Sequence, residues 1–181
     1  MKSLLESILD VDNNIDAVEI PKKPTVSKKD YIYYLQAWYD VMYNAIDNGE
    51  INLSKWIWAV KTYQKWEQPW TIYVGEEDDD INDLIASGNL EEALLKSTYK
   101  MGASEMRWAK EYTDDIIKDF ESGNANGRMS IDGSNSILMA LCGGCFEAFD
   151  AFERGIFSIG TKYDKYAAEI TKAFKLYGFK L

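Results

Sequence analysis

The sequence contains no histidine, which excludes several kinds of active site from this chain. A Ser-His-Asp triad, a Cys-His pair, a histidine-ligated zinc ion and a histidine pH switch all depend on the imidazole ring. Carboxylates, lysine, tyrosine and cysteine can also do acid–base or nucleophilic chemistry. The missing histidines therefore narrow the range of possible enzymes without excluding catalysis.

Cysteine is almost as scarce, and its two copies, Cys142 and Cys145, stand in the sequence Cys-Gly-Gly-Cys. Two cysteines are too few for a disulfide framework. A zinc site would need two further ligands, and the chain has no other cysteine and no histidine. A redox pair should open a helix after a strand, whereas this motif lies inside the apolar helical stretch 137–152. We interpret both cysteines as small buried hydrophobic residues.

Long apolar runs are also missing from the sequence. No stretch approaches the ~18 apolar residues that a transmembrane helix requires. The N-terminus reaches an acidic residue, Glu6, before any long hydrophobic region, which is not the pattern of a secretory signal. These absences predict a cytoplasmic protein, in the producing cell or in an infected host cell, without membrane contact.

Acidic residues are abundant and unevenly placed. The 181 residues include 20 Lys and Arg and 30 Asp and Glu, for a net charge of −10. Residues 76–121 hold 14 acidic and 5 basic residues, so this block carries nearly all of the excess. Such a charge disfavours direct binding to nucleic acid or to an anionic membrane, and permits binding to a basic surface that handles nucleic acid.

Hydrophobic spacing predicts a mainly α-helical fold, an irregular bundle of five or six helices. One helix is expected to start at Ser27 and to stop at Gly49, and a second to run from about Leu53 to Trp66. The capping pattern at Asn89 predicts the longest helix, which reaches Phe120. Its expected inner stripe is Leu95, Tyr99, Gly102, Met106, Ala109, Thr113, Ile116 and Phe120.

A short β-hairpin is expected to pair residues 70–74 with residues 128–131. The length favours one domain, preceded by an arm with a short helix over residues 1–26. Within the helical domain, 27–181, three parts differ in composition. They are an aromatic-rich part (27–75), a strongly acidic part (76–121) and a near-neutral part that holds most of the phenylalanine (122–181).

The acidic run that opens the middle part has two interpretations. An EF-hand calcium loop does not fit, because the sixth and twelfth positions counted from Asp78 are Asp83 and Asn89 rather than Gly and Glu. The acids could simply favour the start of a helix. Spaced carboxylates could also imitate phosphates and occupy a Lys- and Arg-lined groove. On the second reading, the partner-binding residues are Glu76, Glu77, Asp78, Asp79, Asp80 and Asp83.

Aromatic residues suggest a second part of the same surface. Twelve of the 18 Trp and Tyr residues lie between Tyr31 and Tyr73. Trp56 and Trp58 are two positions apart on a helix, so they should not both face the core, and at least one of Tyr31, Tyr33 and Tyr34 should point outward. Exposed Trp and Tyr are enriched at interaction hot spots, so Trp56 and Trp58 are candidate partner-binding residues. The alternative is a core that is simply aromatic.

Two pairs of carboxylates carry the main enzymatic alternative. Each pair has its two acids three positions apart, and therefore on one helix face, where their oxygens could hold Mg²⁺. The pairs are Glu111 with Asp114 and Glu147 with Asp150. This arrangement is similar to that of all-α nucleotide pyrophosphohydrolases, which usually add an ExxE motif on a preceding helix. No such motif completes it here, and a solvated acidic face would give the same spacing.

The favoured function is therefore that of a non-enzymatic interaction protein without a cofactor. It would be a stoichiometric inhibitor or adaptor of the kind used in phage or mobile-element counter-defence, docking an acidic and aromatic surface on a basic nucleic-acid-handling partner. The first alternative is the Mg²⁺-dependent nucleotide enzyme, and the second is an oligomeric structural or assembly protein.

Overall fold

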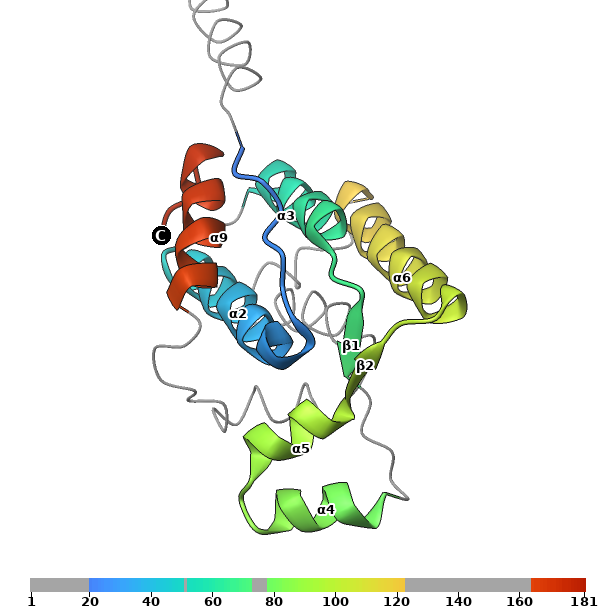
Figure 1. Cartoon of the computed structure of the whole chain (residues 1–181). Coiled ribbons are helices and arrows are strands. Elements are labelled where there is room, and N and C mark those ends of the chain that lie inside the picture. The colour runs from blue at the N-terminus through green and yellow to red at the C-terminus, as the bar shows by residue number, and fades with distance from the viewer. Residues whose placement is uncertain (1–19, 51, 73–77, 123–163) are drawn as a thin grey trace, which may run out of the picture.

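The computed structural model describes residues 20–50, 52–72, 78–122 and 164–181 (Figure 1). This part of the chain is mainly helical with one short two-stranded antiparallel sheet, which confirms the predicted fold class. The elements in chain order are η1 (Lys28–Asp30), α2 (Tyr31–Asp47), α3 (Leu53–Trp66), β1 (Trp70–Ile72), α4 (Asp79–Ala86), α5 (Leu90–Ser97), β2 (Thr98–Lys100), α6 (Ala103–Glu121) and α9 (Asp164–Leu176).

Local sequence signals set several of the helix boundaries. The Ser27 hydroxyl and the Asn52 side-chain oxygen each accept a hydrogen bond at 3.2 Å from the backbone amide three residues later. Such caps satisfy amides that have no partner within their own helix. At the other end, Gly49 and Gly88 follow α2 and α4 with φ of 77° and 82°, a conformation that favours glycine. The predicted start at Ser27 and the predicted stop at Gly49 are confirmed.

Helix α2 forms the centre of the core. All eight residues from 31 to 38 are buried, including Tyr31, Tyr33 and Tyr34. The prediction that at least one of these tyrosines points outward is therefore wrong. Helix α2 packs along α9, and the Trp38 ring meets Trp66 of α3 at 6.0 Å and Phe174 of α9 at 5.7 Å. A helix enclosed by neighbours on several sides can be apolar all round.

The strand partner and the longest helix also differ from prediction. Strand β1 pairs with β2, Trp70 opposite Lys100, whereas the expected partner, 128–131, lies outside the described residues. Because residues 98–100 form this strand, the predicted helix 89–120 is divided into α5 and α6. The amide of Met101 continues the pairing with a hydrogen bond to the Pro69 carbonyl at 2.8 Å. The expected inner stripe is therefore buried over its last four members but not at Tyr99 or Met106.

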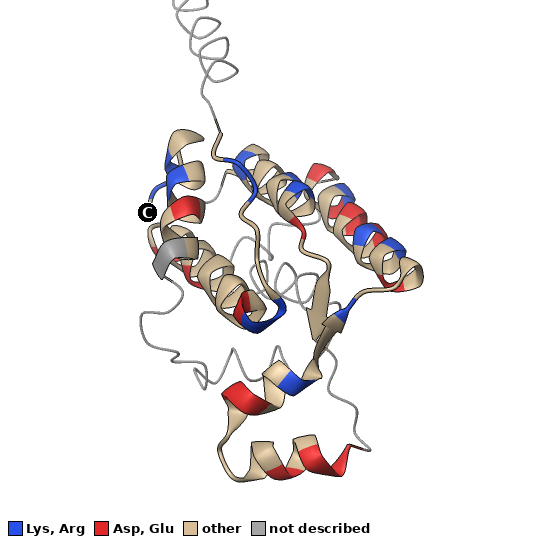
Figure 2. Ribbon diagram, in the orientation of Figure 1, with Lys and Arg blue, Asp and Glu red and all other residues tan. Residues whose placement is uncertain are grey.

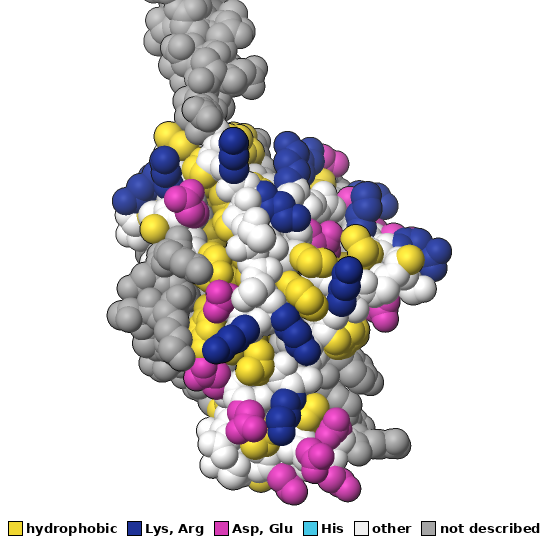
Figure 3. Space-filling view, in the orientation of Figure 1, with side chains coloured by type: hydrophobic (Ala, Val, Ile, Leu, Met, Phe, Trp, Pro, Cys, Tyr) yellow, Lys and Arg dark blue, Asp and Glu magenta, His cyan; other side chains and the backbone are white. Residues whose placement is uncertain are grey.

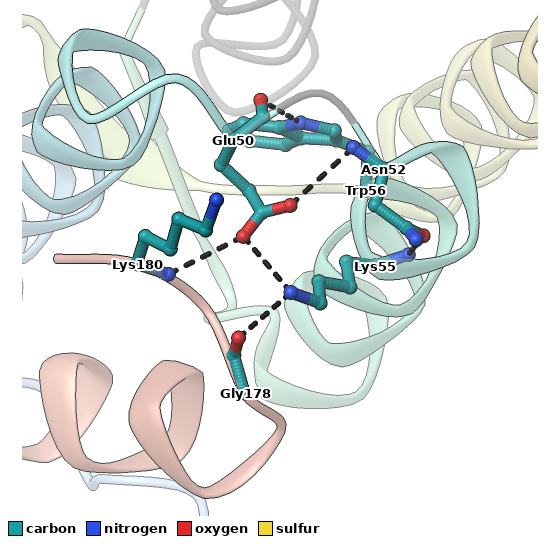
Figure 4. Close-up of polar contacts among 6 residues, drawn as sticks. All are labelled: Glu50, Asn52, Lys55, Trp56, Gly178 and Lys180. Carbon is teal, nitrogen blue, oxygen red and sulfur yellow. Dashed lines mark hydrogen bonds and ion pairs between the residues drawn. The ribbon is translucent and has the colours of Figure 1, made fainter. Parts of the chain in front are cut away.

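A buried carboxylate fastens the C-terminus to the α2–α3 turn (Figure 4). The Glu50 side chain is 4% exposed and accepts hydrogen bonds from Lys55 Nζ at 3.0 Å and from the Lys180 amide at 3.3 Å. Lys55 Nζ also donates to the Gly178 carbonyl at 2.7 Å, and Trp56 Nε1 donates to the Glu50 carbonyl. Burial opposes ionisation of Glu50, but the hydrogen bonds to its carboxylate outweigh burial and lower its pKa.

Candidate interaction surface

Helices α4 and α5 form a helical hairpin that is inserted between the two paired strands. Strand β1 precedes the insertion and strand β2 follows it, so the short sheet brings the two ends of the insertion together. Figure 1 shows the hairpin at one end of the molecule, away from α3, α6 and α9. Helices α4 and α5 pack mainly against each other, through Ile81, Ala93 and Leu94, which are buried. We call residues 78–97 the acidic hairpin.

One hydrogen bond fixes the acidic hairpin to the body of the protein. The hydroxyl of Tyr33, a buried residue of α2, donates to the Glu91 carboxylate of α5. The hairpin is thus held at its strands and at α5, while α4 forms its outer part. Exposed side chains on α4 are therefore carried by a supported element rather than by a loose loop.

The negative charge of the described residues is concentrated on this hairpin (Figure 2). The other described residues hold fifteen basic and thirteen acidic residues. Against the single basic residue Lys96, the hairpin contains the acids Asp78, Asp79, Asp80, Asp83, Glu91 and Glu92. All six of these acidic residues are exposed. A protruding element of this charge attracts basic surfaces and repels nucleic acid.

The structure brings four of the six predicted partner-binding acids together on α4, while Glu76 and Glu77 lie outside the described residues. Asp78 also serves as the N-cap of α4, because its carboxylate accepts a hydrogen bond from the Ile81 amide at 3.1 Å. Asp79 and Asp80 occupy the first helical turn, where the helix dipole favours negative charge. The described acids of the run therefore start a helix, as the first interpretation expects, and they are exposed, as the second would require.

The two predicted tryptophan anchors do not belong to this surface. Trp56 is 2% exposed and donates its indole hydrogen to the Glu50 carbonyl at 3.1 Å, so it is a core residue. Trp58 is half-buried and stacks on Tyr177 at 4.3 Å with an interplanar angle of 8°. Residues two apart on α3 can both be covered because the segment that ends α9 also folds over the helix, bringing Phe179 against both tryptophans.

The exposed tryptophan is instead Trp108, on α6. Its side chain is 46% exposed and stacks on Tyr112, one turn later, with ring centres 5.6 Å apart. Glu105 and Glu111 stand three positions before and after Trp108, so they share its side of the helix. Trp108 is not a member of the inner stripe expected for this helix. Its position in the sequence therefore indicated that its side chain is exposed. Acidic and aromatic side chains are therefore exposed together on α6, at residues other than those predicted to bind a partner.

The candidate metal ligands are only partly described. Glu111 is exposed, and Asp114 accepts hydrogen bonds from Lys110 Nζ at 2.6 Å and Gln64 Nε2 at 2.9 Å. The hydrogen bond from Lys110 is the main cause that lowers the pKa of Asp114, and the bond from Gln64 adds to it. Within the described ranges, no three acidic or cysteine side chains are grouped as metal ligands would be. Glu147 and Asp150 lie outside those ranges, as do Cys142 and Cys145.

No family model matches this sequence, and no curated protein or solved structure shows significant similarity to it. In the part of the chain that the structure describes, every helix is too short or too polar to cross a membrane.

Proposed function

We propose that this protein is a non-enzymatic interaction protein that docks its acidic hairpin on a basic surface of a nucleic-acid-handling partner. It would act stoichiometrically, as an inhibitor or adaptor of the phage or mobile-element counter-defence type. The observation that carries the proposal is the charge of the hairpin, six acids against Lys96 on an element that protrudes from a nearly neutral body.

The physical basis of such docking is replacement of phosphates by carboxylates. Lysine and arginine side chains in a nucleic-acid groove are arranged for a line of negative charges, and a supported helix can present Asp79, Asp80 and Asp83 in a fixed arrangement. Association driven by such charges is fast at low salt and weakens as salt is added. Trp108 supports the proposal as an aromatic anchor, because indole rings bind Arg and Lys side chains by cation–π contact.

Affinity capture from host lysate, read by mass spectrometry, tests this proposal. The triple variant D79N/D80N/D83N removes three exposed charges and leaves the Asp78 cap in place. The matched control D47N/E121Q/E169Q removes three exposed charges elsewhere, so its net charge is the same. We expect a nucleic-acid-handling protein to be retained by the wild type and the control, and lost by the hairpin variant.

Two further measurements sharpen that result. The captured partner should release from the wild type as salt is raised, and W108A should weaken its retention without changing the salt dependence. If the hairpin variant and the wild type hold the same partner with the same salt dependence, the charge-mimicry proposal is refuted.

A further inference from the structure

Seven lysines of the body share a feature that the proposed function does not use. Each is exposed, and none forms an ion pair with any residue in the described part of the chain. The seven are Lys22, Lys23, Lys28, Lys29, Lys61, Lys65 and Lys100; Lys172, Lys175 and Lys180 have the same two properties but lie on α9 and the segment after it. Unpaired surface charges of one sign, when they lie close together, form a field that attracts a surface of the opposite sign.

Hydrogen bonds bring these lysines together from three parts of the sequence. The segment before α2 is bound to the α3–β1 connection, since Gln68 Nε2 donates to the Pro24 carbonyl at 3.1 Å and Trp70 Nε1 donates to the Val26 carbonyl at 3.2 Å. This places the lysines at 22 and 23 beside the end of α3, which carries Lys65. Element η1 also contacts β2, where Lys100 lies. We call these seven residues the lysine face.

Part of the lysine face adjoins the acidic hairpin, because β2, which carries Lys100, follows the hairpin directly and η1 contacts β2. Figure 3 shows basic side chains spread over the body on the side that faces the viewer, and acidic side chains gathered on the hairpin at the lower end of the same side. A surface that is basic over the body and acidic at one end is self-complementary. A second copy, turned by 180° about an axis in the plane of that side, would bring its hairpin to the lysines and its lysines to the hairpin.

We propose that two copies of this chain pair through this side, each placing its acidic hairpin on the lysine face of the other. The inference goes beyond the proposed function and does not depend on it, because no other protein is needed. Two-fold symmetry makes every hairpin–lysine contact occur twice. An exposed apolar group, Ile85, lies in the hairpin at 39% exposure and would be covered in the pair.

Charge complementarity favours a second copy over nucleic acid as the occupant. A polyanion laid on the lysine face would run toward the acidic hairpin on the same side, and like charges would repel it. A second copy instead supplies carboxylates to the lysines and lysines to the carboxylates. Pairing would also cover the hairpin, so the paired form and any complex with a basic partner would compete for the same acids.

The molar mass of the purified full chain, measured by light scattering across concentration and salt, tests the proposal. We expect a mass twice 20.7 kDa at low salt that falls toward the single-chain value as salt is raised. The variant K61E/K65E reverses part of the lysine face, and D80K/D83K reverses part of the hairpin. Each variant alone should dimerise roughly tenfold or more weakly, because like charges then oppose each other.

Mixing the two variants gives the decisive result. In a mixed pair the reversed hairpin of one chain meets the reversed lysine face of the other, and the remaining contact has its original signs. An equimolar mixture should therefore dimerise more strongly than either variant alone. The control K172E/K175E reverses two exposed lysines of α9 outside the lysine face and should dimerise like the wild type.

Several outcomes would overturn the proposal. The first is a wild type that is monomeric at every concentration. The second is dimerisation of both charge-reversed variants as strong as that of the wild type. The third is an equimolar mixture of the two variants that dimerises no more strongly than each variant alone. Binding of a fluorescent oligonucleotide that K61E/K65E abolishes would assign the lysine face to nucleic acid instead. If D80K/D83K loses helicity by circular dichroism, D79N/D80N/D83N takes its place and should weaken the dimer. None of these results depends on the partner of the proposed function, because that partner is absent from measurements on the purified chain.

Discussion

Changing Glu50 to glutamine should loosen the attachment of the C-terminus to the α2–α3 turn. The carboxylate lies at a point where three parts of the chain meet, and it accepts hydrogen bonds from Lys55 Nζ and from the amides of Asn52 and Lys180 (Figure 4). Glutamine keeps the size of the side chain but removes its charge and one acceptor oxygen. The variant thus tests electrostatics rather than packing.

The expected cost follows from the surroundings of the pair. A hydrogen bond to a charged group contributes about 1.5–3 kcal/mol, and removing one partner of a fully buried pair costs about 3–5 kcal/mol. The Lys55 side chain is 25% exposed and keeps its bond to the Gly178 carbonyl, so water and that carbonyl offset part of the loss. We expect E50Q to lower the free energy of unfolding by about 2 kcal/mol, or the Tm by roughly 4–8 °C.

The same interaction has a defined pH dependence. The folded-state pKa of Glu50 lies below its usual value of 4.5, so the folded chain holds the ionised form more strongly than the unfolded chain does. The stabilisation is fully present above that usual value and is lost as the pH falls through the lowered, folded-state pKa. The difference between wild type and E50Q should therefore be largest near neutral pH and should shrink in acid.

Urea unfolding followed by circular dichroism, at neutral pH and in acid, measures both effects. K55M removes the other partner, and the double variant E50Q/K55M should cost less than the sum of the two single variants because they share one interaction. Equal stability of E50Q and wild type at neutral pH, or a difference that is the same in acid, would refute the reasoning.

Three further predictions concern the core, a turn and the metal alternative. Y34F should cost about 1 kcal/mol at neutral pH, because it removes the hydrogen bond to the Trp66 carbonyl at 2.8 Å. Burial raises the pKa of Tyr34 to about 12, so only the unfolded wild type ionises near pH 10, and the wild type should lose stability relative to Y34F as the pH rises from there; a constant difference would contradict this. G49A should lower the free energy of unfolding by about 1–2 kcal/mol, because φ is 77° although a Cβ would meet nothing within 4 Å; G49N should recover part of that loss in the same urea assay. Millimolar Mg²⁺ should leave the Tm of the wild type unchanged, as it should that of E111Q/D114N, because Asp114 of the wild type is already bound by Lys110 and Gln64. A Mg²⁺-dependent rise in Tm that the wild type shows and the variant does not would support the metal site instead.

The sequence predicted best where a local rule acts alone. The start at Ser27, the limits of α3 and the turn at Gly49 all depend on capping and on backbone conformation within a few residues. The sequence likewise indicated that the acids on α4 are exposed, because several adjacent carboxylates are rarely buried without partners.

Prediction failed where a distant part of the chain supplied the partner. Residues 98–100 lie between two helical sequences and form a strand only because β1 offers backbone hydrogen bonds there. Trp58 is covered by Tyr177, more than one hundred positions away, and no spacing rule on α3 could indicate it. The exposure of Trp108, in contrast, agrees with its position outside the expected buried stripe, which is a local property of α6.

The amino-acid sequence by itself therefore determined the helical class, the ends of several helices and the concentration of negative charge between residues 76 and 121. Composition, periodicity and capping are properties of neighbouring residues, so they can be identified in the sequence without knowledge of the fold. Only the tertiary structure decided that the acids form a protruding hairpin, that three segments carrying exposed lysines are brought together, and which tryptophans are buried. Those properties depend on which elements pack together, and packing is set by contacts between residues far apart in the chain.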